Sequence, residues 1–160
     1  MYTPVGGHPG PDLAPPERAP AAGDDEFLFR QGPARGLSRI RFSDWRAAFE
    51  PFAGVPNVAR FAELAESFKQ LLVDAAPDAE QQKDLDYLLT LGELFTLIPY
   101  AQLILEQAEL VGLADDTLDQ IFDVLVRDFS AYAVELHGKT SATPAQAHWA
   151  RAAITRPVVD

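Results

Sequence analysis

Apolar residues recur at spacings of three and four along most of the chain beyond residue 56. This spacing is typical of amphipathic helices, whose apolar side faces a core. No stretch alternates with a period of two long enough to indicate a sheet. The pattern therefore predicts an all-α fold, a four-helix bundle-like domain over residues 57-157, with helices at about 57-75, 78-111, 116-137 and 143-155.

Residues that start and stop helices lie near these predicted ends. Asn57 is the predicted N-cap of the first helix, and Asp78 with Gln81 three residues later predicts a reciprocal cap for the second. A capping box with proline at the first helical position opens the fourth. The capping box consists of Thr143-Pro144-Ala145-Gln146. The stop signals are Pro77, Gly112, Gly138 and Arg156-Pro157.

The second helix is apolar on nearly every side between residues 85 and 105, where only Asp86 and Glu93 carry charge. Such a helix is either a central core helix or a membrane span. The two charges and Pro99, which removes a helical hydrogen bond, favour a buried core helix and no membrane span. Because three amphipathic helices barely surround it, we expect the rest of its surface to be covered by the segment before residue 57 or by another polypeptide.

Two segments of different composition precede the helices. Residues 1-25 contain six prolines and four glycines, which predicts a flexible arm or linker. Residues 26-56 predict an extended strip with a short helix that Ser43 caps and whose apolar side includes Trp45 and Phe49. The strip holds six of the chain's aromatic residues and five arginines: Phe27, Phe29, Phe42, Trp45, Phe49 and Phe52, and Arg30, Arg35, Arg39, Arg41 and Arg46.

Charge and cysteine content exclude several classes of function. The net charge is −11, so the chain as a whole is a poor ligand for nucleic acid. There are no cysteines, which excludes disulfides, thiolate zinc sites and cysteine nucleophiles and fits a reducing, cytoplasmic location. Between Asp78 and Asp128 the sequence contains twelve acidic residues and only two basic ones, Lys83 and Arg127. The simplest hypothesis is that the arginine-rich strip folds back across this acidic region.

Arg39 and Arg41 are candidate phosphate contacts, because the guanidinium group matches phosphate oxygens. A solvated charged strip is the alternative. Glu93 is the one carboxylate in a strongly apolar setting, and burial would raise its pKa as enzymes do for a general acid or base. The alternatives are that Glu93 lies on a polar edge of its helix or pairs with Arg127.

No motif predicts a catalytic or metal site. A di-iron bundle needs two Glu-x-x-His pairs, whereas Glu135 and His137 are two residues apart and point in different directions. Nucleophile-elbow and nucleotide-binding glycine motifs are absent. His137 is expected to cap the end of the third helix, and His148 to pack or to face solvent. We therefore predict no catalytic residue and no metal ligand.

Several runs resemble the carboxy-terminal region of long actinobacterial acyl-CoA dehydrogenases, a flavoprotein family. The resemblance extends from about Phe27 to Pro157. It is carried by Leu91-Gly92-Glu93-Leu94-Phe95-Thr96, Tyr100, Leu103-Ile104-Leu105-Glu106-Gln107-Ala108, Asp119-Gln120-Ile121-Phe122-Asp123-Val124-Leu125-Val126-Arg127-Asp128-Phe129-Ser130, His137-Gly138-Lys139, Thr143, Gln146 and Arg156-Pro157.

The resemblance implies an accessory helical domain of an oxidoreductase in fatty acid metabolism, whose FAD and catalytic glutamate belong to the rest of the enzyme. This chain departs from the family, since it lacks the β domain, the flavin contacts and the segment with the catalytic glutamate. We expect it to be inactive by itself and to bind no FAD alone. Its expected partners are the dehydrogenase core, a neighbouring subunit or a second copy. The alternative is an independent helical protein–protein interaction module.

Overall fold

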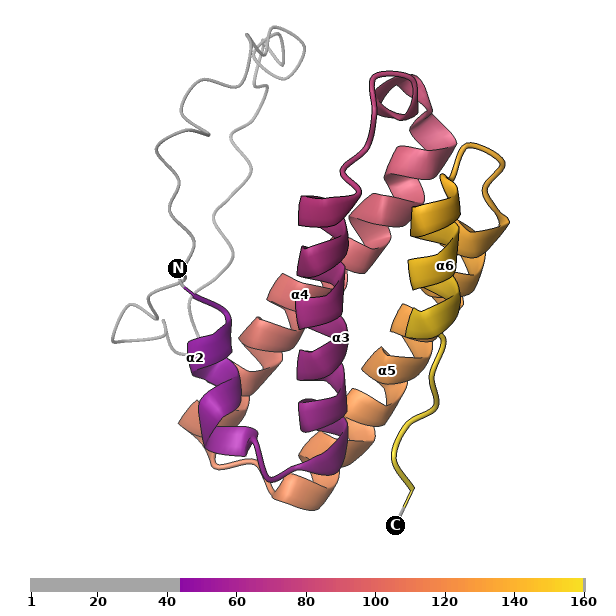
Figure 1. Cartoon of the computed structure of the whole chain (residues 1–160). Coiled ribbons are helices and arrows are strands. Elements are labelled where there is room, and N and C mark those ends of the chain that lie inside the picture. Colours follow the sequence, from indigo (N-terminus) through magenta and orange to yellow (C-terminus); the bar gives the residue numbers. More distant parts are fainter. Residues whose placement is uncertain (1–43, 160) are drawn as a thin grey trace, which may run out of the picture. The chain divides into compact units, whose positions relative to one another are not determined.

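The structure, a computed structural model, describes residues 44–159, and in this range it is all-helical (Figure 1). Its helices are α2 (Arg46–Phe49), α3 (Pro56–Asp74), α4 (Leu85–Val111), α5 (Asp115–Gly138) and α6 (Pro144–Ala153). Two 3-10 turns, Glu50–Phe52 and Gln81–Lys83, precede α3 and α4. The predicted all-α class is confirmed for this range. The predicted arm at 1-25, most of the strip and the Ser43 cap lie outside it.

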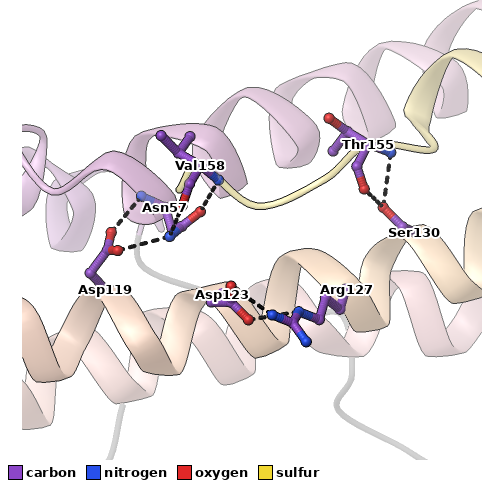
Figure 2. Close-up of polar contacts among 7 residues, drawn as sticks. All are labelled: Asn57, Asp119, Asp123, Arg127, Ser130, Thr155 and Val158. Carbon is purple, nitrogen blue, oxygen red and sulfur yellow. Dashed lines mark hydrogen bonds and ion pairs between the residues drawn. The ribbon is translucent and has the colours of Figure 1, made fainter. Parts of the chain in front are cut away.

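Helix α3 begins one residue before the predicted start, because Pro56 occupies its first turn and Val55 is the N-cap. The prediction that Asn57 caps this helix is wrong. Asn57 is buried inside the first turn, and its side chain bonds Asp119 of α5 and the backbone of Val158 instead (Figure 2). The partners of Asn57 are 62 and 101 residues away in the sequence, so a local pattern could not identify them.

The predicted start of the second helix at residue 78 is also wrong. Asp78 and Gln81 do cap each other, with the Asp78 carboxylate accepting from the backbone amide of Gln81 at 2.9 Å, but they close only a 3-10 turn. Helix α4 begins seven residues later, where the Asp84 carboxylate accepts from the Tyr87 amide at 3.2 Å. Gly112, with φ of 64°, ends the helix in the left-handed conformation as predicted.

A buried pair of glutamines holds the turn before α4 in place. The side chains of Gln81 and Gln146 bond each other, the first donating to the second at 2.7 Å. The side-chain amide of Gln81 also donates to the Ser141 carbonyl, and the side-chain amide of Gln146 donates to the Ala75 carbonyl. Gln146 completes the predicted capping box with Thr143 at the start of α6. These bonds explain why the chain turns at residue 81 instead of continuing as a helix.

Helix α5 packs against α3, α4 and α6, so the core of the described part forms around it (Figure 1). Aromatic rings fill this core at edge-to-face geometry, as between Phe61 and Phe122, whose centroids are 5.7 Å apart. Phe49 of α2 joins the same cluster. After α6 the chain continues as an extended segment whose Thr155 exchanges two hydrogen bonds with the Ser130 hydroxyl of α5 (Figure 2).

Candidate functional site

The outer face of α4 is an exposed apolar surface. Seven large apolar side chains on this helix are more than half exposed: Leu85, Leu89, Phe95, Tyr100, Leu103, Leu110 and Val111. The opposite side is buried against α2, α5 and the turn before α4, and includes Tyr87, Leu94 and Leu105. The expectation of a core helix is therefore met on one side of α4, where α2 from the segment before residue 57 supplies part of the expected cover. Cover of the other side stays a prediction.

The middle of this outer face carries two small residues, Gly92 and Thr96. A Cβ atom placed on Gly92 would meet nothing within 4 Å. The Thr96 hydroxyl donates to the Gly92 carbonyl at 2.7 Å, one helical turn back. This internal bond satisfies the hydroxyl hydrogen, so the threonine presents mainly its methyl group. The result is a gap in the row of large apolar side chains, with little polar surface to desolvate.

Pro99 lies between these small residues and Leu103. Because proline has no amide hydrogen, the Phe95 carbonyl lacks its helical donor. Phe95 is 56% exposed. The proline therefore removes one hydrogen bond of the helical ladder on the same length of helix as the apolar side chains.

Acidic residues flank the apolar surface. Helix α4 contains four acids and neither lysine nor arginine. On the side toward α5, Glu93 lies near Tyr132; burial raises the pKa of Tyr132, and the charges of Glu93, Asp128 and Glu135 raise it further. Asp86 is the exception among the α4 acids, since the Lys139 ammonium group binds its carboxylate at 2.8 Å.

Glu93 itself does not meet the condition for a catalytic carboxylate. It is exposed, so the desolvation that would prepare it for acid–base chemistry is missing. Its proposed partner Arg127 binds Asp123 instead, at 2.7 Å. Of the alternatives, a position on a polar edge of α4 is the one that the structure supports. The phosphate candidates Arg39 and Arg41 lie outside the described residues.

The two histidines in the described range are both exposed. His137 lies in the last turn of α5, as predicted, and its Nδ1 is 2.9 Å from the Ala147 carbonyl of α6. His137 thus links α5 to α6. The sequence did not predict this contact. His148 faces solvent on α6. Within residues 44–159 no three histidines or carboxylates gather closely enough to hold a metal ion.

A second apolar surface is a hollow of about 590 Å³ between α2 and α3, lined by Trp45, Phe49, Val58 and Ala62 among others. Its polar rim is paired internally. The Arg46 guanidinium group binds both Asp44 and Glu66, and these hydrogen bonds raise the pKa of Arg46. The hollow therefore offers apolar walls with one neutralised cation at the edge.

Helix α4 is the one helix within residues 44–159 that is long and apolar enough to cross a membrane. Length and composition alone are weak evidence for a span, because core helices of soluble proteins pass the same test.

The chain matches no family model, no curated protein and no solved structure. The resemblance to acyl-CoA dehydrogenases therefore rests on the quoted motifs alone.

Proposed function

We propose that this chain is a helical interaction domain, not catalytic by itself, that packs against another polypeptide through the outer face of α4. The observation that carries the proposal is the row of seven exposed apolar side chains on one helix. At roughly 100 Å² for each half-exposed side chain, they present about 700 Å² of apolar surface. Monomeric proteins rarely expose that much in one patch, whereas a stable interface buries about 800 Å² on each partner.

A four-helix bundle-like arrangement of α3, α4, α5 and α6 is the fold that we propose for this role. In such a bundle each helix contributes one side to the core and keeps another side available. The exposed side of α4 is unusual because it is apolar, whereas the exposed sides of α3 and α5 carry most of their charged residues.

Two versions of the proposal differ in the partner. In the first, the chain is the accessory domain of an FAD-dependent acyl-CoA dehydrogenase and packs on the flavin-binding core or a neighbouring subunit. The motif resemblance supports this version. In the second, it is an independent protein–protein interaction module. The exposed apolar face supports both versions equally, and a cytoplasmic location is proposed for either.

The test is size-exclusion chromatography with light scattering on the tagged full chain, purified under native conditions from cells of its source organism. The double variant Leu89→Ser/Leu103→Ser removes two exposed leucines from α4, and Val73→Ser, at a side chain that is 68% exposed on α3, is the matched control.

The proposal predicts that the wild-type chain and the control elute in an assembly heavier than the 17.5 kDa monomer, and that the α4 variant does not. A wild-type chain that elutes as a monomer would contradict it. Absorbance between about 300 and 500 nm on the same peak separates the two versions, because a dehydrogenase core would bring its flavin.

A further inference from the structure

The occupant of the outer face of α4 can be argued from its charge. The apolar row runs from Leu85 to Val111, about 39 Å of helix at 1.5 Å per residue. At 100° per residue, Glu93 lies about 80° to one side of Leu103, and Glu106 lies about 60° to the other. Both carboxylates belong to exposed residues. By the same arithmetic Leu85, Leu89, Tyr100, Leu103 and Leu110 lie between the two carboxylates, whereas Val111 is level with Glu93 and Phe95 lies beyond Glu106. The leucine part of the apolar row is therefore bordered by negative charge on both sides and by no cation of its own helix.

The α5 side strengthens this negative border. Asp128 and Glu135 are exposed there and, like Glu93, form no ion pair within the described residues. Burial first, and then the charges of Glu93, Asp128 and Glu135, raise the pKa of Tyr132, which is consistent with all three carboxylates lying on the Tyr132 side of α4. A partner that buries the apolar row must bring these carboxylates close to its own surface, where opposite charge is favourable and like charge is costly.

Gly92 indicates the form of the partner. Glycine inside a helix is unfavourable relative to alanine, and the packing among residues 44–159 does not require it, because a Cβ there meets nothing within 4 Å. A glycine at this position is explained if the backbone or a large side chain of another molecule approaches the helix closely here. With Thr96 on the next turn, Gly92 leaves room for a leucine-sized side chain from a second helix.

These observations separate the candidate occupants. A second copy of the chain would bring the same carboxylates and a net charge of −11 to the interface. A membrane surface with anionic headgroups would be repelled by the same border, since helices that lie on membranes carry lysine and arginine at this position. The chain's own arginine-rich strip has the right charge, but Gly32, Pro33 and Gly36 interrupt it, so its sequence does not predict a continuous helix along the row. A cationic amphipathic helix from a partner satisfies both the apolar row and its acidic border.

We propose that the outer face of α4 docks an amphipathic helix of a partner protein, with leucine-like residues against Gly92 and Leu103 and lysine or arginine residues against Glu93 and Glu106. This proposal rests on the proposed function and specifies its partner. The partner helix matches the apolar row at about 18–25 residues.

The experiment measures binding of a fluorescent peptide to the full chain by anisotropy. The probe has about 21 residues and repeats Leu-Lys-Lys-Leu-Leu-Lys-Leu, so that its apolar residues share one helical side. The control peptide has glutamate in place of every lysine. The variants are Leu89→Ser/Leu103→Ser, Gly92→Leu and Glu93→Gln/Glu106→Gln, with Val73→Ser and Glu50→Gln/Asp74→Asn as controls matched in chemistry on other elements. Circular dichroism verifies that each variant is folded.

We expect the lysine peptide to bind and the glutamate peptide not to bind. The double leucine variant and Gly92→Leu should each raise Kd about tenfold or more, because they remove apolar contact or fill the gap. The double glutamine variant should raise Kd about threefold and weaken its dependence on salt. The control variants should change Kd less than about twofold.

Three results would overturn the inference. Peptide binding that is insensitive to the α4 variants would show that α4 is not the site. Self-association in light scattering that the leucine substitutions abolish would assign the face to a second copy, and the proposed function would stand without this inference. Binding to phosphatidylcholine–phosphatidylglycerol vesicles that the same substitutions abolish would assign the face to lipid, and both proposals would fail.

Discussion

Replacing Gly92 by alanine is expected to stabilise the free chain. Alanine is favoured over glycine inside a helix by about 1 kcal/mol, because glycine loses more conformational freedom on folding. The added Cβ meets nothing within 4 Å, so no steric cost opposes this gain. For a domain of this size the change corresponds to a rise in Tm of about 3 °C.

Gly112→Ala is the matched control for this prediction. Gly112 also has open space around its Cβ position, but its φ of 64° is a conformation that costs alanine about 1–2 kcal/mol. The two substitutions should therefore change the free energy of unfolding in opposite directions, measured by urea denaturation followed by circular dichroism. A loss of stability in Gly92→Ala would contradict this prediction, since it would mean that the outer face of α4 is already covered in the free chain.

Three further predictions follow from the described contacts. Asn57→Leu should lower the free energy of unfolding by about 2–3 kcal/mol in urea denaturation, because the part-buried Val158 amide loses its acceptor and the Asp119 carboxylate keeps only the hydrogen bond from the backbone amide of residue 57. Gln120→Ala, nearby on the exposed surface of α5, should cost less than about 0.5 kcal/mol. Burial first, and nearby carboxylates second, raise the pKa values of Tyr87 and Tyr132 in the folded chain above 10.0, so the unfolded chain loses these protons at a lower pH. The free energy of unfolding should therefore be unaffected by the titration of these tyrosines below pH 10 and fall as pH rises through their folded-state pKa values. The fall should be smaller in Tyr87→Phe. The purified chain with added FAD should reduce no electron-accepting dye in the presence of acyl-CoA, and dye reduction above the rate of FAD alone would contradict its expected inactivity.

The periodic helices could be predicted from the sequence because their apolar residues mark one side. The spacing gave α3, α5 and α6 to within two residues at most ends, and the Thr143–Gln146 capping box is present as predicted. The start of α4 could not be predicted in this way. Gln81 has the local pattern of a helix cap, but its side chain is held by Ser141 and Gln146, which are more than fifty residues away.

The candidate site shows a different limit. The sequence marks α4 as apolar all round, and this signal led to the expectation that something must cover it. Apolar residues on every side cannot tell which side lacks a neighbour, so the exposure of Leu89 and Leu103 required the structure. Gly92 and Thr96 belong to one of the runs that resemble acyl-CoA dehydrogenases. Their spacing of four residues places them on the same side of a helix, but the sequence does not indicate that this side is exposed.

Site-specific photo-crosslinking of the full chain in cells of its source organism measures whether the outer face of α4 contacts another polypeptide. A benzophenone amino acid replaces Leu89, Tyr100, Leu103 or Leu110 on the outer face of α4, or Val73 and Val159 as exposed apolar positions elsewhere. The account predicts one adduct of a single mass at the α4 positions, weaker or absent at the two controls. Equal labelling at all six positions, or no adduct on α4, would contradict the claim that this face is an interface.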